Sequence, residues 1–314
     1  MQKELEDHVL RKHWKAIPLN FLPPNKRPLP MVWSMKRKHN RLGEINKWKA
    51  RLCAGGHKSI ENVNYWATYS PVVSRSAVRL ILVLELINNW TMRSIDFVMA
   101  FPQAHTKTDI YMKPPTVPSN FVIPDLPKFM DRFTHVYKLI KKLYGLKDVG
   151  RTWHKFLHKG LLECNWKQSD IDDCLFTQRD ILLLLYVDDA ILVSKSNNRI
   201  EAEIRSLKSS FGITEKGPLK DYLGTRFDRN SDGSIELTQH RMIQRAVKVI
   251  GLDVNDRHVK MHNYPASSEK LLDNDPNGKP RLQPWHYRSA VDFLSYISAM
   301  IRPDINMPVQ QCIP

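Results

Sequence analysis

The sequence predicts an α+β fold. Helical and strand patterns interleave along its 314 residues without the regular strand–helix–strand rhythm of a parallel α/β protein. Residues 35–58 and 181–195 each have the pattern of two strands joined by a turn. Apolar residues recur at helical spacing from Ile200 to Phe211, as they do on the buried side of a helix. These observations together favour separate helices and antiparallel strand pairs.

The first ninety residues predict four elements. Residues 1–13 fit a short helix, and the proline-rich residues 16–30 fit an extended arm. Residues 35–58 fit a basic β-hairpin that turns at 40–43. Either Ser74 or Ser76 would cap a helix over 74–89. This helix is apolar nearly all round, so we expect most of it to be buried.

The remaining elements follow from the same kinds of signal. Apolar runs predict a strand over 90–101 that ends near Asp96, and a short strand at 110–115 that prolines stop. Prolines mark 114–135 as a loop and 264–284 as a linker. Helices are expected over 150–164, over 197–212 with Gly212 as the stop signal, and over 239–251 and 286–300. Residues 221–240 predict a β-hairpin that turns at 231–233.

Composition narrows the class of function. Lys and Arg number 48 against 32 Asp and Glu, which gives a net charge of +16. Such an excess favours a polyanionic partner, although it also serves solubility. Its densest cluster is the hairpin, with Lys36, Arg37 and Lys38 on the first strand and Lys49 and Arg51 on the second.

Other classes of protein are not supported by the sequence. The longest apolar runs, 181–187 and 80–84, are far shorter than the ~20 residues of a membrane span. The charged N-terminus does not resemble a secretory signal. The four cysteines are scattered without the close spacing of a zinc site, which favours free thiols in a reducing compartment.

Two adjacent carboxylates stand in the middle of an apolar segment. Asp188 and Asp189 interrupt ILLLLYVDDAILVSK, the stretch over 181–195. Adjacent carboxylates repel one another and are costly to desolvate unless a cation neutralises them, and Mg2+ prefers such oxygen ligands. Asp96, at the end of its own apolar strand, is the candidate third ligand. The alternatives are an ordinary Asp-Asp turn and, for Asp96, a helix N-cap.

An ordered set of motifs resembles one family. YVDD resembles the signature turn of reverse transcriptases, and the wider set resembles the polymerases of copia-type (Pseudoviridae) LTR retrotransposons. The matching stretches, in the order of the family, are KARLCAGGHKS (49–59), YSPVVSRSAVRLILVL (69–84), IDFVMAFPQA (95–104), IYMKPP (110–115), KLYGLKDVGRTWH (142–154), LLLYVDDAILVSKS (183–196), PLKDYLGTRF (218–227) and YRSAVDFLSYISAMIRPDI (287–305). A lone YxDD is a weak signal, whereas this ordered set is specific.

The resemblance implies a right-hand polymerase of fingers, palm and thumb with a central antiparallel palm sheet. It implies an N-terminal arm over 1–30, fingers and palm over 31–225, and a thumb-like and connecting region over 226–314 that stops before any ribonuclease H domain. The chain would then be a fragment of a longer polyprotein. It would act inside the cell, in a cytoplasmic virus-like particle or in the nucleus, and have no membrane partner. Its partners would be an RNA template, a DNA primer-template and deoxynucleoside triphosphates, with other polyprotein products such as an integrase and a ribonuclease H.

The resemblance also implies roles for individual residues. Asp96, Asp188 and Asp189 would hold two Mg2+ ions, for which Mn2+ can substitute. The nucleotide would be bound by Lys49, Arg51, Phe101, Tyr144 and Gly145. The primer-template would be bound by Tyr186, Tyr222, Leu223, Gly224, Lys36, Arg37 and Lys38. Lys216 and Lys220 are alternative candidates for the general acid.

The chain departs from the family pattern at three positions. Asp148 stands where glutamine is usual, Gly150 stands where proline is frequent, and Pro102 stands where leucine normally follows Ala100 and Phe101. An extra carboxylate near the template groove would weaken strand binding. The leading hypothesis is an RNA- and DNA-templated DNA polymerase. The alternatives are a remnant that binds nucleic acid without turnover and, less well supported, a cyclase-like palm nucleotidyl transferase.

Overall fold

The computed structural model describes residues 1–39, 44–117, 133–252, 265 and 285–313. The chain divides into two compact units. The first comprises Met1–Val73 and Thr91–Gly217, and the second comprises Ser74–Trp90 and Pro218–Pro314. Both mix helices and strands, as the sequence predicts. The fingers, palm and thumb boundaries remain predictions.

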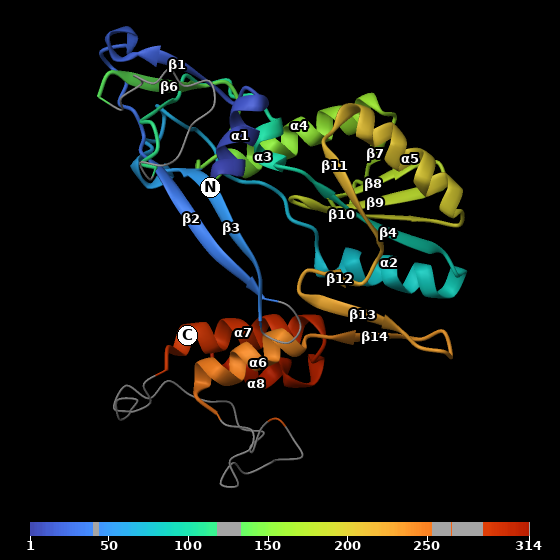
Figure 1. The fold of residues 1–314 in the computed structure, drawn as a ribbon. Helices are drawn as coiled ribbons and strands as arrows, with labels where there is room; N and C mark the ends of the chain where they lie inside the picture. Colours follow the sequence, from blue (N-terminus) through green and yellow to red (C-terminus); the bar gives the residue numbers. More distant parts are fainter. Residues whose placement is uncertain (40–43, 118–132, 253–264, 266–284, 314) are drawn as a thin grey trace. The chain divides into compact units, whose positions relative to one another are not determined.

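The first unit contains most of the strands (Figure 1). Its helices are α1 (Gln2–Leu10), η1 (Leu19–Phe21), η2 (Gly56–Lys58), α3 (Ala100–Gln103), α4 (Val149–Glu163) and α5 (Asn197–Ser210). Its strands are β1 (Trp14–Pro18), β2 (Met31–His39), β3 (Ile45–Ala54), β4 (Thr91–Phe97), β5 (Tyr111–Met112), β6 (His135–Leu139), β7 (Lys167–Gln168), β8 (Leu175–Gln178), β9 (Ile181–Tyr186), β10 (Asp189–Ser194) and β11 (Ile213–Pro218).

A six-stranded sheet forms the centre of this unit. Its strand order is β11-β4-β10-β9-β8-β7, and β10 pairs antiparallel with both β4 and β9. Helices α4 and α5 pack on one side of it, because Phe97 of β4 contacts Trp153 of α4 and Phe211 just after α5. Leu183, Leu184 and their β10 neighbours are buried. Burial of each such side chain contributes about 1.5–3 kcal/mol, so this sheet is a rigid support.

The basic hairpin is confirmed as the antiparallel pair β2–β3, which Figure 1 shows as a long two-stranded arm. Its predicted turn at 40–43 lies outside the described residues. The predicted extended arm begins as a strand, since β1 pairs with β6 in a three-stranded sheet of order β1-β6-β5. Leu5 of α1, Leu52 of β3 and Leu139 of β6 share one buried cluster, which joins these elements.

Two buried histidines, one on α1 and one just before β1, make the stability of the first unit sensitive to acid. His8 and His13 are buried, and their Nδ1 atoms lie 2.6 Å apart. Burial, with the charges of His8, Lys141 and Arg11, lowers the pKa of His13 to about 3. Below pH ~6.5 the unfolded chain therefore takes up a proton that the folded chain refuses, and stability falls as the pH drops from there towards 3.

We expect the free energy of unfolding to fall by about 1.4 kcal/mol for this group between pH 7.5 and pH 5.5. Urea unfolding at the two pH values measures this loss. His13→Gln, which cannot be protonated, serves as the control and should have a smaller pH dependence. An equal dependence in the parent and His13→Gln would contradict the prediction.

The second unit contains α2 (Arg75–Asn88), β12 (Asp221–Tyr222), β13 (Thr225–Arg229), β14 (Ile235–Thr238), α6 (His240–Ile250), α7 (Tyr287–Met300), η3 (Pro303–Ile305) and α8 (Asn306–Gln311). The turn at 231–233 is confirmed, and Gly233 has a φ of 87° there. β12 adds a third strand to the predicted hairpin. The helices expected over 239–251 and 286–300 are confirmed. The predicted linker over 264–284 lies outside the described residues apart from Pro265.

Two sequence expectations about helices are wrong. Ser74, rather than Ser76, caps α2 by accepting a hydrogen bond from the Ala77 amide. The expectation that most of this helix is buried is wrong. The helix buries one side and leaves the other exposed, with Ile87 77% accessible. Gly212 does not stop α5 in a left-handed cap, because the helix ends at Ser210 and Phe211 is already extended. None of the helices in the described ranges is long and apolar enough to cross a membrane.

Candidate active site

The three aspartates come together at one end of β4 and β10. Asp96 in β4 is the register partner of Asp189, the first residue of β10. Asp189 also pairs with Tyr186, the last residue of β9, so Val187 and Asp188 form the turn between the two strands. The predicted hairpin is therefore confirmed, but Val187 and Asp188 form its turn instead of the two aspartates, and the turn lies next to Asp96. One carboxylate lies in the turn and its neighbour lies at the start of a strand.

Backbone contacts fix this turn. Val187 adopts the left-handed conformation, with a φ of 54°. Its carbonyl oxygen accepts a hydrogen bond of 2.6 Å from the indole Nε1 of Trp153 on α4. The amide of Phe97 donates to the carbonyl oxygen of Asp188 over 2.7 Å. A strained β-branched residue persists only where its surroundings hold it, so this turn is a preorganised feature.

The three aspartates bring several negative charges close together. Burial, with the charges of Asp189 and Asp96, raises the pKa of Asp188 above its usual value. Lys216 on β11 supplies a cation, because its Nζ lies 2.9 Å from Asp96 Oδ1 and 2.5 Å from Asp189 Oδ1. Burial lowers the pKa of Lys216, but its hydrogen bonds to Asp189 and Asp96 outweigh this effect and raise it. These aspartates therefore attract cations.

The chemistry of this donor set fits a hard divalent cation, since carboxylate oxygens are the ligands that Mg2+ prefers. The three carboxylates nevertheless do not have the arrangement of a metal-binding site in this structure. In the part of the chain that the structure describes, no three His, Cys, Asp or Glu side chains form a group that would hold a metal ion. Lys216 instead bridges two of the three carboxylates. A bound metal would have to share these oxygens with the Lys216 ammonium or displace it.

A pocket of about 360 Å3 adjoins the aspartates. Asp96 and Asp188 line it together with Lys49 and Arg51 of β3 and with Tyr144. The Arg51 guanidinium lies over the Tyr144 ring, 4.8 Å from its centroid, in a cation–π contact that holds it in place. The predicted nucleotide-binding residues Lys49, Arg51 and Tyr144 therefore share one pocket with two of the predicted metal ligands.

Sequence reasoning missed the contribution of the N-terminal helix to this pocket. Met1, Lys3, Glu4 and Asp7 also line it. Glu4 reaches the hairpin, where its Oε1 accepts a hydrogen bond from the Leu52 amide over 3.2 Å. No local pattern relates residues 1–7 to the aspartates, because contacts across such distances in the sequence arise only from folding. The two acidic residues make the pocket less positive than its Lys and Arg residues alone would.

Other predicted residues lie near this pocket without lining it. Phe101 on α3 contacts Tyr144, with ring centroids 5.1 Å apart, and lines a separate apolar pocket of about 130 Å3. Gly145 has a φ of 87°, and a Cβ there would lie 2.3 Å from the Ala54 carbonyl oxygen. This glycine is therefore required for close packing of β3 on the loop before α4.

Three predicted primer contacts and one candidate general acid belong to the second unit. Tyr222 is buried at the end of β12, and Leu223 and Gly224 form a left-handed turn with φ values of 51° and 73°. The Leu223 carbonyl oxygen accepts a hydrogen bond from the Tyr296 hydroxyl on α7. Lys220 precedes β12, and its carbonyl oxygen accepts from the Phe227 amide. These residues form one structured turn of the second unit, and their role at the primer end stays a prediction.

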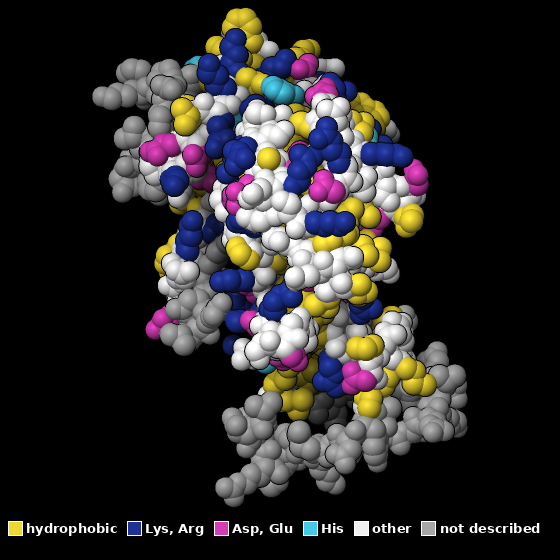
Figure 2. All heavy atoms as spheres, turned by 90° about the vertical axis from the view of Figure 1, so that its right-hand side faces the viewer, with side chains coloured by type: hydrophobic (Ala, Val, Ile, Leu, Met, Phe, Trp, Pro, Cys, Tyr) yellow, Lys and Arg dark blue, Asp and Glu magenta, His cyan; other side chains and the backbone are white. Residues whose placement is uncertain are grey.

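The basic residues of the β2–β3 hairpin lie on both of its faces. Lys36 is the register partner of Lys49, and Ser34 that of Arg51, so these residues share one side of β2–β3. Arg37 is the partner of Trp48 on the other side, where its guanidinium lies 5.9 Å from the indole centroid. Lys38 is the register partner of Lys47. Figure 2 shows Lys and Arg side chains spread widely over the face that it draws.

The unusual Asp148 has a different role from the one that the sequence suggests. The Nζ atom of buried Lys142 lies 2.8 Å and 2.7 Å from its two carboxylate oxygens. The extra carboxylate therefore compensates a buried cation within the chain. Because a buried unpaired ammonium would be costly, Asp148 serves folding at this position rather than adding an uncompensated charge to a template groove.

Comparisons with known proteins establish the family. The sequence matches the family described as reverse transcriptase (RNA-dependent DNA polymerase) over residues 13–262. The chain belongs to this family. Among curated proteins, this reverse transcriptase chain is 29% identical to the retrovirus-related Pol polyprotein from transposon RE1 of Arabidopsis thaliana over 93% of its own length. It is 28% identical to that from transposon TNT 1-94 of Nicotiana tabacum over 97% of its length.

The reverse transcriptase chain spans only 19% and 23% of those two polyproteins. The identity to these polyproteins confirms the predicted resemblance to the Pol polyproteins of copia-type transposons. A solved structure of telomerase from Candida albicans, in complex with a fragment of telomeric RNA, aligns over 80% of this chain and 55% of that one. The alignment has 11% identity and a TM-score of 0.37.

Proposed function

We propose that this chain is a template-directed DNA polymerase that extends a DNA primer on an RNA or DNA template. The observation that carries the proposal is the Asp96–Asp189 register pair beside Asp188, next to a pocket lined by Lys49 and Arg51. Family membership supports it. The six-stranded sheet would be the palm, the β2–β3 hairpin the fingers, and the helices of the second unit the thumb of a right-hand polymerase.

Asp96, Asp188 and Asp189 would hold two Mg2+ ions, or Mn2+ in their place. When bound, the metals lower the pKa of the primer 3′-hydroxyl and stabilise the departing pyrophosphate. Lys49 and Arg51 would bind the β- and γ-phosphates of a deoxynucleoside triphosphate, with Tyr144 holding Arg51 in place. Lys216 is favoured over Lys220 as the general acid, because its Nζ already contacts two of the aspartates.

The other site residues would guide the nucleic acid. Tyr144 and Gly145 would lie beside the nascent base pair, and Phe101 beneath the sugar of the incoming nucleotide. Tyr186, Tyr222, Leu223 and Gly224 would hold the primer end. Lys36, Arg37 and Lys38 would neutralise backbone phosphates. The relatives are Pol polyproteins of transposons, so the partners would be RNA and DNA strands within a retrotransposon particle or the nucleus, together with other polyprotein products.

Primer extension with Mg2+ on poly(rA)/oligo(dT) tests this proposal directly. Incorporation of dTTP that depends on Mg2+ and on the template supports polymerase activity. A remnant without turnover would bind the primer-template and leave its length unchanged. Binding, measured by fluorescence anisotropy of a labelled primer, therefore accompanies each extension assay.

Primer-template affinity should fall steeply with salt, because phosphate contacts release counterions. Reversing Lys36, Arg37 and Lys38 to Glu should weaken binding to all sequences alike. It should also reduce the slope of log affinity against log salt by roughly 2 to 3. Anisotropy titrations at several salt concentrations give both quantities.

The matched control reverses Lys155, Lys195 and Lys208 to Glu, three exposed lysines on or beside α4, β10 and α5. It changes the net charge equally but leaves the hairpin intact, so its slope should stay near that of the parent. Equal losses in the two triple variants would show that net charge, rather than the hairpin, controls binding. A flat salt response in the parent would contradict the nucleic-acid role of the charge.

A further inference from the structure

The position of Lys216 depends on an edge strand. β11 lies at the edge of the six-stranded sheet, with β4 as its neighbour. The pairing register of a strand is weakly specified where few contacts fix its position. A slip of one residue moves every side chain of the strand to the other face of the sheet. Because Lys216 is on β11, its contacts with Asp96 and Asp189 require this register to be held.

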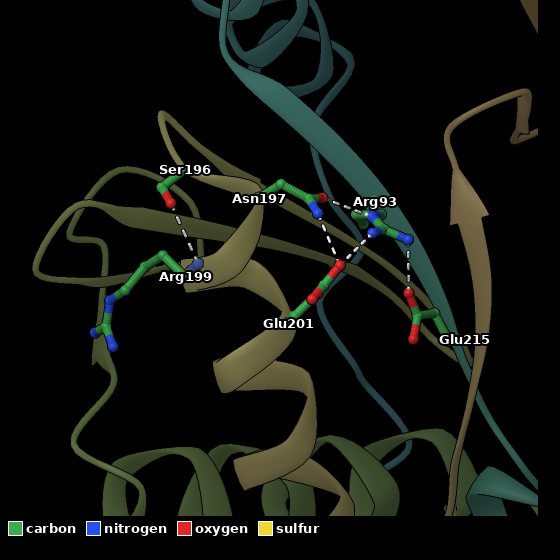
Figure 3. A network of polar contacts seen from close by, with 6 residues as sticks. All are labelled: Arg93, Ser196, Asn197, Arg199, Glu201 and Glu215. Atoms are coloured by element: carbon green, nitrogen blue, oxygen red, sulfur yellow. Dashed lines mark hydrogen bonds and ion pairs between the residues drawn. The ribbon is translucent and has the colours of Figure 1, made fainter.

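A charged network fixes this register, on the side of the sheet opposite to the aspartates (Figure 3). Arg93 of β4 donates from Nη1 to Glu215 Oε1 of β11 over 2.9 Å and from Nη2 to Glu201 Oε1 of α5 over 2.8 Å. Its Nε donates to Asn197 Oδ1 over 2.9 Å, and Asn197 Nδ2 donates to the same Glu201 oxygen. One guanidinium thus ties β11 to β4 and to the first turn of α5.

Strand alternation relates this network to the aspartates. Neighbouring side chains of a strand point to opposite sides, so Glu215 and Lys216 emerge on different sides of β11. The exposure of β11 alternates accordingly, with Glu215 half-buried and Lys216 exposed. Arg93 and Asp96 are three residues apart on β4 and likewise face opposite sides. When Arg93 binds Glu215 on the helix-covered side, Lys216 is placed over Asp96 on the open side.

A second anchor lies at the start of β11. The Gly212 carbonyl oxygen accepts hydrogen bonds from the Val98 amide over 2.8 Å and from Gln103 Nε2 over 3.0 Å. The Gly212 amide donates to Gln103 Oε1 over 3.0 Å. A slip between the two anchors would bring Glu215 towards Asp96 and Asp189, and Lys216 towards Arg93. Like charges would then meet on both sides of the sheet, so the alternative register is disfavoured.

We propose that Arg93 and Glu215 are positioning residues, which fix the register of β11 on β4 and thereby hold Lys216 at Asp96 and Asp189. The consequence for catalysis rests on the proposed function, whereas the placement of Lys216 does not. The chain offers a matched control in Glu201. It binds the same guanidinium at 2.8 Å and is similarly accessible, with 39% exposure against 30% for Glu215, but it lies on α5 and not on β11.

The placement is tested by the acetylation rate of Lys216 with an N-hydroxysuccinimide ester, read by peptide mass spectrometry on the full chain. Lys195 in the same digest is the internal reference. Glu215→Gln should accelerate acetylation of Lys216 by roughly twofold to fivefold, since an ion pair that holds the strand is lost. Glu201→Gln should stay near the parent. Equal rates in the parent and Glu215→Gln, or equal acceleration in both variants, would overturn the proposal.

The catalytic consequence is tested by single-nucleotide extension kinetics. Glu215→Gln should lower kcat with little change in the KM for dTTP, and it should have no further effect in a Lys216→Ala background. Additive losses would show that Glu215 acts independently of Lys216. If Lys216→Ala extends at the parental rate, the catalytic consequence is rejected. If the parent itself does not extend primers, the proposed function fails while the acetylation rates still decide the placement.

Discussion

Asp188→Asn is expected to abolish primer extension while leaving primer-template binding close to that of the parent. The amide keeps the shape of the carboxylate but removes its charge. Asp188 lies in a turn that hydrogen bonds from Trp153 and Phe97 hold in place. A neighbouring carboxylate therefore cannot readily move into the position of the altered side chain. We expect a loss of roughly a thousandfold or more in the extension rate, as when a preorganised charge-stabilising group is removed from an active site.

The chain contains its own control for this change. Asp172 and Asp173 form another adjacent pair, ahead of β8, and Asp173 is exposed. Asp173→Asn makes the same chemical change away from the candidate site and should extend primers at the parental rate. Steady-state extension and anisotropy of both variants, at equal protein concentration, give the comparison. An Asp188→Asn chain that extends at the parental rate would show that the metal assignment is wrong.

Local patterns were sufficient to predict the hairpin that bears Asp188. An apolar run on each side of a polar turn specifies two buried strands, and the structure places them at Ile181–Tyr186 and Asp189–Ser194. The same reasoning predicted β4 and its end near Asp96. Asp96 was proposed as the third carboxylate because the chemistry needs one, but its pairing with Asp189 was not predicted, because register between strands far apart in the sequence has no local signal.

The pairing of charges and the burial of helix faces account for what the sequence did not reveal. Lys216 and Lys220 are equivalent as sequence positions, and only the fold shows that Lys216 contacts the aspartates. Asp148 was taken as a surplus charge because its partner Lys142 was one of many lysines. Helix α2 was expected to be buried because its composition is apolar, yet composition does not show which side a neighbouring element covers.

Phe101→Val is expected to raise ribonucleotide incorporation by orders of magnitude while deoxynucleotide use drops modestly. The reason is steric, since a flat ring beneath the sugar of the incoming nucleotide would occupy the space that a 2′-hydroxyl needs. Phe101 lies on α3, just beyond β4, and its ring packs on Tyr144 with centroids 5.1 Å apart. Tyr144 in turn lines the pocket that contains Asp96 and Asp188. The ring of Phe101 therefore contacts one of the residues that line this pocket.

The opposing explanation is that Phe101 is simply a packing residue. It lines a pocket of about 130 Å3 with Trp153 and Val187 and packs partly against the buried cluster of the N-terminal elements. Loss of packing would lower stability by about 1–3 kcal/mol and reduce the use of both nucleotides together. Phe176→Val, on β8, provides the reference for that behaviour, because Phe176 is fully buried beside His158 and lines neither of the two pockets.

Kinetics with dTTP and UTP on the two purified variants separate these explanations. Phe176→Val should lower both activities in proportion and reduce the urea midpoint, which leaves the UTP/dTTP ratio unchanged. Phe101→Val should increase that ratio by orders of magnitude, because the steric exclusion of a sugar hydroxyl acts on one substrate and not on the other. The ratio cancels any difference in the fraction of folded enzyme. An unchanged ratio in Phe101→Val would assign the ring to packing and reject the gate.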